Sequence, residues 1–295
     1  MAEWVADPGS DARVLEFRAA DPAAARTLAP GQVEHFNRQG FVSPLRVLEP
    51  GAADALRRYI DELVARVVEA PDRRNAYSII SYHLVCAGLY DLALTPRILD
   101  CVEDLLGPDF VFWGSHLFCK LPGNPMAVPL HQDATYWPLT PTRSVSVWLA
   151  IDDADEENAA VRFAPGSHRL GALPHAEHPL DGTRVLNREV VEPERFAPLF
   201  TNRLRAGEAS IHSDLLLHGS AANRSERRRA GITLRYAAAE VRPVPGTEWF
   251  ISPAVHARGA IPGHWPHRAR PDGEHPERMA QVWGDFDGTP VDAAR

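Results

Sequence analysis

The fold is indicated most clearly by the stretch Ser144-Val145-Ser146-Val147-Trp148-Leu149-Ala150-Ile151. Every second residue from Val145 to Ile151 is aliphatic, and the residues between them are small or aromatic. Because successive side chains of a β-strand point to opposite faces, this alternation predicts a strand with one aliphatic face and one mixed face. We expect the aliphatic face to pack under helices and the mixed face, which carries Trp148, to line a lumen that holds a ligand.

Short strands are expected on both sides of this stretch. Period-2 patterning begins near Phe110, and further strands are predicted near Ala160 to Ala164, Ala209 to Ile211 and Ala230 to Ala238. Many short strands in series are typical of a β-barrel or β-sandwich. We therefore assign residues 110–241 to a mainly β core, a cupin-like jelly roll built as a double-stranded β-helix.

Two other parts of the chain carry few strand signals. The insert 171–200 is expected to form a loop over the mouth of the barrel. Residues 242–295 form a C-terminal extension rich in Pro, Gly and His, in which the pattern indicates only a possible strand near Trp249.

Helices are predicted on the N-terminal side of the core. Apolar residues recur at helical spacing in Ala52 to Val68 and in Pro96 to Leu106, and Gly31 to Gln39 reads as a short helix ended by a glycine. Residues 29–109 are therefore expected to form a helical buttress for one sheet. Residues 1–28 are polar and rich in alanine, and we expect a poorly fixed, flexible arm.

The composition is that of one globular domain covering residues 1–295. Hydrophobic residues make up 45% and charged residues 24%, which leaves enough apolar material for a core. A net charge of −8 argues against a nucleic-acid or anionic-membrane partner. We expect a small-molecule substrate and a monomer or homodimer.

The N-terminal residues indicate a cytoplasmic location. The N-terminal residues include acids where a signal peptide needs bases, and no apolar run follows them. Cys86, Cys101 and Cys119 are odd in number, widely spaced and embedded in apolar stretches. They read as reduced core residues and not as a disulfide framework or a zinc site.

A metal site is predicted from two patches that lie far apart in the sequence, His131-Gln132-Asp133 and His218-Gly219-Ser220. Residues i and i+2 of a strand share a face, so His131 and Asp133 can bind one ion while Gln132 turns away. Two histidines and one carboxylate, with coordination positions left open, are the ligand set of nonheme Fe(II) oxygenases.

A second triplet of the same form, His212-Ser213-Asp214, competes with this assignment, because a His-x-Asp pattern alone is weak evidence. The next separated histidine after it, His256, lies in a Pro- and Gly-rich segment without strand pattern. His131 and Asp133 are instead followed by His218. We interpret Ser213-Asp214 as a turn that leaves His212 beside the site without a metal-binding role.

The basic run Arg227-Arg228-Arg229 precedes the predicted strand 230–238. An arginine can bind a dicarboxylate through two parallel hydrogen bonds, which the point charge of a lysine does less specifically. Strand parity places Arg229, Gly231 and Thr233 on one face and Arg228 on the other. Arg229 is therefore the candidate clamp, against the alternative that the whole run is a solvated face.

Four stretches together carry a resemblance to a known family: Lys120-Leu121-Pro122-Gly123, His131-Gln132-Asp133-Ala134-Thr135-Tyr136-Trp137, Pro165-Gly166-Ser167-His168 and His218-Gly219-Ser220-Ala221-Ala222-Asn223-Arg224-Ser225. In this order, from about Ala29 to about Tyr236, they resemble the phytanoyl-CoA dioxygenase (PhyH) family of Fe(II)/2-oxoglutarate oxygenases. Several matching motifs are far more specific than any one of them.

The resemblance implies that Fe(II) binds His131, Asp133 and His218, and that the enzyme uses 2-oxoglutarate and O2 as cosubstrates. It places Arg229, Ser220, Lys120 and Trp148 where the family contacts 2-oxoglutarate. The alternative roles are a strand cap for Lys120 and ordinary core packing for Trp148. One departure is Ala159, where the family usually has the glycine of an Asn-Gly pair, and it affects the local turn and not the metal site.

The function that the resemblance implies is hydroxylation of an unactivated C–H bond in a small polar metabolite, such as a phosphonate, an amino-acid derivative or a natural-product intermediate. One alternative is a cupin-like isomerase or hydrolase that uses its metal as a Lewis acid. Another is a non-catalytic jelly-roll binding protein. The arginine after the distal histidine disfavours both alternatives, because neither needs a clamp for a dicarboxylate.

Overall fold

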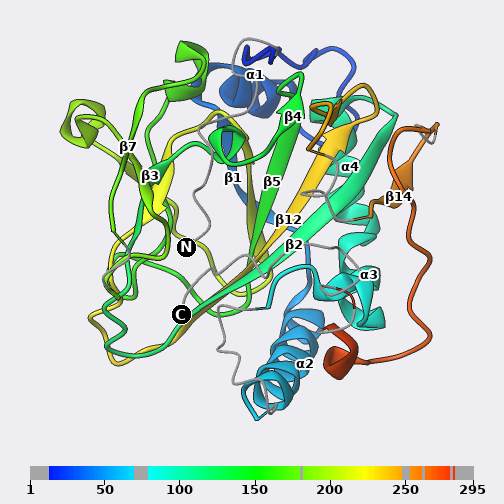
Figure 1. The fold of residues 1–295 in the computed structure, drawn as a ribbon, viewed down its shortest axis with the longest axis vertical. Helices are drawn as coiled ribbons and strands as arrows, with labels where there is room; N and C mark the ends of the chain where they lie inside the picture. The colour runs from blue at the N-terminus through cyan, green and yellow to red at the C-terminus, as the bar shows by residue number, and fades with distance from the viewer. Residues whose placement is uncertain are drawn as a thin grey trace.

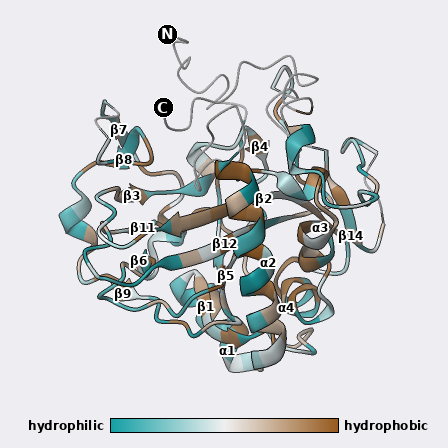
Figure 2. Ribbon diagram, turned by 90° about the horizontal axis from the view of Figure 1, so that it is seen from below, coloured by the Kyte–Doolittle hydropathy of each residue, from teal (hydrophilic) through white to brown (hydrophobic). Residues whose placement is uncertain are grey.

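The computed structural model describes six parts of the chain: residues 13–69, 79–179, 182–247, 253–260, 263–279 and 282. Two antiparallel sheets form the walls of a jelly roll, and helices cover the outer side of the larger sheet (Figures 1 and 2). The predicted mainly β, cupin-like fold is confirmed.

The larger sheet has six strands in the order β1-β10-β5-β12-β2-β14. Its strands, in sheet order, are β1 (Phe41–Arg46), β10 (Glu208–Ser213), β5 (Ser144–Ala150), β12 (Arg229–Ala238), β2 (Phe110–Lys120) and β14 (Val255–Arg258). Strands far apart in the sequence thus lie side by side, as a double-stranded β-helix requires.

The smaller sheet has the order β3-β11-β6-β9. Its strands are β3 (Val128–His131), β11 (His218–Ser220), β6 (Arg162–Phe163) and β9 (Phe200–Thr201). Two further pairs stand apart from both walls, β4 (Leu139–Thr140) with β13 (Arg242–Pro243), and β7 (His175–Glu177) with β8 (Arg188–Val190).

The four α-helices are α1 (Pro30–Gln39), α2 (Pro50–Val68), α3 (Ala87–Ala93) and α4 (Pro96–Leu106). Short 3-10 turns connect the remaining elements: η3 (Tyr82–Leu84), η4 (Asp133–Thr135), η5 (Ser167–Leu170), η6 (Pro193–Phe196) and η8 (Pro276–Arg278). Helix α1 ends where predicted, because Gly40 adopts the left-handed conformation, with φ of 87°, that glycine tolerates best. In Figure 2 the smaller sheet lies on one side, the larger sheet in the middle and α2, α3 and α4 on the other side.

The two faces of β5 pack as its alternation predicts. Val145, Val147 and Leu149 belong to the main core, together with buried residues of α2 and α4 such as Ile60 and Val102. The opposite face contributes Trp148 and Ala150 to a separate cluster with Phe163 of β6. The mixed face is therefore turned toward the space between the two sheets.

Residues 13–28 are held more firmly than a poorly fixed arm would be. The guanidinium of Arg13 donates to the carbonyls of Trp137, at 2.7 Å, and Leu139, at 3.2 Å. Leu28 is buried in the main core. The prediction of a flexible arm therefore does not describe this part, and residues 1–12 lie outside the described residues.

Two elements of the buttress were not predicted. Strand β1 contains Pro44, which removes a ladder donor, and it lies at the edge of the larger sheet where a proline is tolerated. Helix α3 has seven residues including Gly88, which is too short to show a helical period in the sequence.

The insert 171–200 and the C-terminal extension also contain more structure than their patterns indicate. The insert carries the β7–β8 hairpin where a plain loop was expected. In the extension, β14 pairs with β2, and Trp265 and Met279 are buried in the main core. The possible strand near Trp249 lies outside the described residues.

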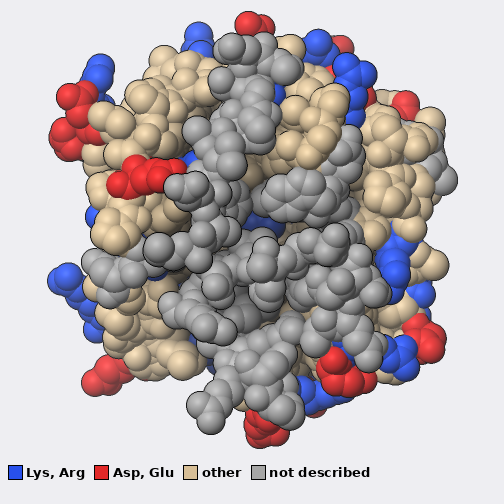
Figure 3. Space-filling model, in the orientation of Figure 1, with Lys and Arg blue, Asp and Glu red and all other residues tan. Residues whose placement is uncertain are grey.

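Charges of both signs alternate around the rim of the face seen in Figure 3, and neither sign gathers into a patch among the coloured residues. Within the described residues, no helix combines the length and the apolar character that crossing a membrane requires.

Candidate active site

His131 and His218 face each other across the smaller sheet. They are direct partners in the β3–β11 pairing, and their ring centroids lie 4.3 Å apart. His131 Nδ1 lies 2.8 Å from the carbonyl of Pro129, and His218 Nδ1 lies 3.0 Å from the carbonyl of Leu216. Because a carbonyl only accepts, each Nδ1 carries a proton, and in the neutral tautomer with that proton the lone pair lies on Nε2.

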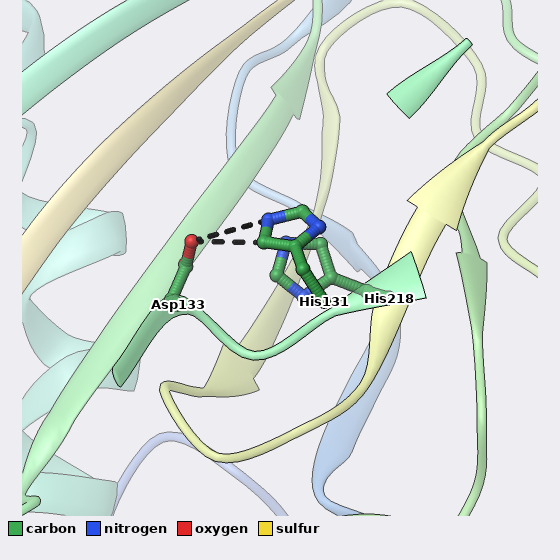
Figure 4. Close-up of side chains that lie close together, drawn as sticks. All are labelled: His131, Asp133 and His218. Atoms are coloured by element: carbon green, nitrogen blue, oxygen red, sulfur yellow. Dashed lines mark ion pairs between the residues drawn. The ribbon is translucent and has the colours of Figure 1, made fainter. Parts of the chain in front are cut away.

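Asp133 completes the group (Figure 4). Its Oδ1 lies 3.6 Å from His131 Nε2 and 3.9 Å from His218 Nε2. Its Oδ2 accepts a hydrogen bond of 2.9 Å from Ser146 Oγ of β5. One ligand atom from each of the three residues lies within 4.8 Å of the others, so the donor set fits a metal ion such as Fe(II).

The triplet 131–133 does not lie entirely on a strand, as the spacing argument assumed. Strand β3 ends at His131, and Asp133 begins the 3-10 turn η4. Gln132 between them is still extended, with φ of −103° and ψ of 128°, so the alternation of side chains continues through it. The two side chains therefore converge although the strand has ended.

Gln132 turns away from the metal group, as predicted, and holds the insert. Its Nε2 donates to the carbonyls of Gly171 and Leu215, at 2.8 and 2.7 Å. Its Oε1 accepts from the backbone N–H of Leu173 at 2.8 Å. The residue between two of the candidate ligands thus fixes the start of the insert against the barrel.

The electrostatics favour the protonation states that metal ligands need. Burial opposes the charge of Asp133, but the nearby imidazoles of His218 and His131 and the guanidinium of Arg235 outweigh it and hold the pKa of Asp133 below its ordinary value. Burial, assisted by the neighbouring His131, lowers the pKa of His218 well below its ordinary value. The site therefore presents a carboxylate and a neutral imidazole, the forms that bind metals.

His212 lies beside this group and not in it. Its Nε2 is 3.9 Å from Asp133 Oδ2, and neither ring nitrogen has a hydrogen-bond partner in the described structure. Burial lowers the pKa of His212 to about 4. The chain turns after Ser213, where β10 ends, and Asp214 accepts from the backbone N–H of Ser144 at 3.1 Å. Among the described residues, the metal-type ligand atoms that lie within 4.8 Å of one another belong to His131, Asp133 and His218. The second triplet is not part of this group.

A cationic cluster lies close to the metal group. Arg229 and Lys120 are direct partners where β12 pairs with β2, and both are buried. Arg229 Nη2 donates to Ser220 Oγ at 3.3 Å, and its guanidinium carbon lies 5.6 Å from the ring centroid of Trp148. All four residues expected around 2-oxoglutarate are thus brought together. One of them, Ser220, lies two residues after His218 on β11.

Arg228 faces the opposite side, as strand parity predicts. Its guanidinium forms two hydrogen bonds with Asp152, at 2.7 and 2.9 Å, and one of 2.5 Å with Asp61 of α2. Arg228 therefore ties β12 to the helical layer, while Arg229 points into the lumen.

The surroundings of Lys120 oppose its positive charge. Burial, together with the charges of Arg229 and Arg162, lowers its pKa to about 6. Its Nζ donates to the carbonyls of Ala221 and Ser220, and it forms no ion pair within the described residues. Because burial and neighbouring cations disfavour the ammonium form of Lys120, this cluster is suited to bind a ligand that carries negative charge.

A family model described as phytanoyl-CoA dioxygenase matches residues 36–231. The chain belongs to this family. Among solved structures, the apo form of the non-heme monooxygenase ThoJ superposes with a TM-score of 0.72 and 27% identity, covering 86% of this chain and 94% of that one.

Curated relatives match over different lengths. An ectoine dioxygenase of Nocardia farcinica is 27% identical over 260 residues, 79% of this chain and 85% of the relative. A probable phytanoyl-CoA dioxygenase of Caenorhabditis elegans is 29% identical over 158 residues, 50% of this chain and 50% of the relative. The matches to the first relatives named phytanoyl-CoA dioxygenase span about half of their length.

The departure from the family at Ala159 has a structural counterpart. Ala159 is buried and adopts a left-handed conformation with φ of 65°. Asn158 before it accepts from the backbone N–H of Asp155 and donates to the carbonyl of Asp153, so it shapes the turn. Glycine suits this conformation better than alanine, which explains the glycine of the family's Asn-Gly pair.

Two residues that support the site were not predicted. Ser146 holds Asp133, and it lies on the same face of β5 as Trp148, so strand parity was the available signal. Gly231 leaves room for Trp148, since a Cβ at this position would lie 2.1 Å from Cζ2 of the indole. Nothing in the local sequence indicates that contact, because it depends on the β12–β5 register.

Proposed function

We propose that this chain is an Fe(II)- and 2-oxoglutarate-dependent dioxygenase that hydroxylates an unactivated C–H bond of a small polar molecule. The observation that carries the proposal is the convergence of His131, Asp133 and His218 beside a buried cluster of Lys120, Arg229 and Ser220. Two imidazoles and a carboxylate as ligands leave positions free for a bidentate cosubstrate and O2.

Each residue has a distinct task in this proposal. Fe(II), when bound, supplies the activation of O2 that is coupled to conversion of 2-oxoglutarate into succinate and CO2. Arg229 and Ser220 bind the distal carboxylate of 2-oxoglutarate, and Lys120 adds a third donor. Trp148 packs against Arg229 and keeps water from the bound carboxylate. Ser146 fixes the orientation of Asp133.

The names of relatives support a small and polar substrate. They include a methylphosphonate hydroxylase of Gimesia maris, an ectoine dioxygenase of Nocardia farcinica and a probable hypophosphite dioxygenase of Stutzerimonas stutzeri. A Lewis-acid isomerase or hydrolase and a non-catalytic binding protein remain the rivals, and neither forms succinate from 2-oxoglutarate.

Anaerobic titration with Fe(II) tests the metal ligands. His131→Ala and His218→Ala should each lose tight Fe(II) binding, because a three-ligand site cannot replace a lost bond. His256→Ala, on exposed β14, is the matched control and should bind as the wild type does. Tight binding with iron-dependent succinate formation in both site variants would exclude this assignment.

A further inference from the structure

Arg235 lies on the lumen side of β12, six residues after Arg229 and therefore on the same face. Its direct partners are Ser146 of β5 and Gly114 of β2. Ser146 donates to Asp133, while Ser220 at the other end contacts Arg229 and lies two positions from His218. The metal group thus lies between two arginines whose Cα atoms are roughly 20 Å apart, at about 3.3 Å per residue.

The guanidinium of Arg235 is held by aromatic rings. Its central carbon lies 5.2 Å from the ring centroid of Trp137 and 5.8 Å from that of Trp113. Gly114 lies beside it, where a Cβ would be in ordinary van der Waals contact with the Cδ of Arg235, at 3.6 Å. Contacts of this kind fix the plane of a guanidinium and leave its edge free to donate.

Arg235 has no acceptor for its hydrogen bonds in the described structure. Its Nε is buried without a partner, and no ion pair or hydrogen bond of its terminal nitrogens occurs among the described residues. Arg228 pairs with two carboxylates, and Arg229 contacts Ser220, so the lack of a partner sets Arg235 apart on its strand.

An unpaired charge of this kind costs free energy unless something compensates it. The described carboxylate that acts electrostatically on Arg235 is Asp133, whose oxygens are directed at the two histidines and Ser146. A ligand that brings its own anionic group into the lumen would supply the missing acceptors through two parallel hydrogen bonds.

We propose that Arg235 anchors the primary substrate, which carries a carboxylate or phosphonate group bound by the guanidinium edge. This places the carbon to be oxidised between Arg235 and the metal group, on the opposite side from Arg229 and its dicarboxylate. The inference rests on the proposed function and names the substrate class of the same site.

The test uses the full chain loaded anaerobically with Fe(II) and 2-oxoglutarate. A panel of small carboxylates and phosphonates, including ectoine and methylphosphonate, is titrated by calorimetry, each acid beside its fully methylated ester, which lacks the anionic group. In the wild type, we expect acids to bind and their esters to bind at least tenfold more weakly. In Arg235→Gln this preference should disappear, and Arg235→Lys should keep part of it. Arg242→Gln, an exposed arginine of β13, should behave as the wild type does.

The two proposals fail in different ways. Loss of acid-over-ester preference in Arg235→Gln with unchanged Fe(II) and 2-oxoglutarate affinity supports the anchor. If Arg235→Gln retains the preference, if esters bind as well as acids, or if no acid of the panel binds the loaded wild type, Arg235 is not the anchor. Failure of the wild type to bind Fe(II) and 2-oxoglutarate would instead overturn the proposed function. A melting temperature measured for each variant separates a loss of folding from a loss of recognition.

Discussion

Arg228 and Arg229 are neighbours in sequence with opposite surroundings. The first pairs with Asp152 and Asp61 toward the helices, and the second is buried beside Ser220 and Trp148. Arg229→Ala should therefore weaken 2-oxoglutarate binding about ten- to a hundredfold, because a charge-assisted contact contributes about 1.5–3 kcal/mol. Titration of the Fe(II)-loaded protein with 2-oxoglutarate under anaerobic conditions measures this.

Arg228→Ala is the matched control for this prediction. It should leave the affinity for 2-oxoglutarate near the wild-type value and lower the stability, because Asp152 would be left without its bidentate partner. The reverse result, with weak cosubstrate binding in Arg228→Ala alone, would mean that the two arginines exchange roles in solution.

Ala159 is the position at which a single substitution should stabilise the protein. A non-glycine residue in the left-handed region costs about 1–2 kcal/mol, which glycine avoids. Glycine itself lowers the stability by about 0.5–1 kcal/mol, because it gives the unfolded chain more conformational entropy. Ala159→Gly should therefore raise the free energy of unfolding by about 0.5–1 kcal/mol. Urea denaturation measures it, with Ala160→Gly, the next residue and not one with positive φ, as a control that should destabilise.

At the scale of elements, the pairing of β12 with β2 places Lys120 opposite Arg229. We therefore expect the protonation state of Lys120 to change when the cosubstrate binds. The pKa of Lys120 in the ligand-free protein is about 6, lowered by burial and by neighbouring arginines, so at pH 8 its amine is largely neutral. A bound dianion favours the ammonium form and raises that pKa. Binding of 2-oxoglutarate at pH 8 should therefore take up close to one proton.

Calorimetry in buffers of different ionisation enthalpy measures this uptake, and Lys120→Met should abolish it. The lowered pKa of Lys120 also makes the free energy of unfolding of the ligand-free protein depend on pH. Because the unfolded chain holds this proton up to its ordinary pKa near 10.4, the ligand-free protein should gain stability as pH rises from about 6 toward 10. A binding enthalpy that is independent of the buffer would show that Lys120 is charged before the ligand arrives.

Elements also decide how much of the site could be predicted from the sequence. Alternation alone separated Arg229 from Arg228 and placed Trp148 on the lumen side, because parity survives wherever a strand is regular. The role of Lys120 came only from motif resemblance, since its pairing with Arg229 depends on the register of two strands more than a hundred residues apart in sequence. Arg235 shares the parity of Arg229, but its lack of a partner depends on residues from several elements, which no local pattern reveals.

At the scale of the whole molecule, the C-terminal extension is part of the core. Strand β14 completes one edge of the larger sheet, and Trp265 is 2% exposed in the main cluster. Its Nε1 donates to the carbonyl of Val241 at 2.9 Å, and its ring lies 6.5 Å from that of Trp113, which flanks Arg235. Isolated apolar residues among Pro and Gly gave no periodic signal, so sequence patterns alone could not predict this packing.

Trp265→Ala should therefore destabilise the protein by about 3–5 kcal/mol, because removal of a buried indole costs its transfer free energy and leaves a cavity. Urea denaturation measures the loss. Trp265→Phe is the matched control: it keeps most of the apolar surface and loses one hydrogen bond to Val241, which also accepts from His264 at 2.7 Å, so we expect a loss of about 1 kcal/mol. Fe(II) and 2-oxoglutarate should still bind Trp265→Ala where it remains folded, because the hydrogen-bond partners of the three candidate metal ligands among the described residues lie outside the extension. Equal unfolding midpoints for the wild type and Trp265→Ala would show that the extension rests on the barrel without supporting it.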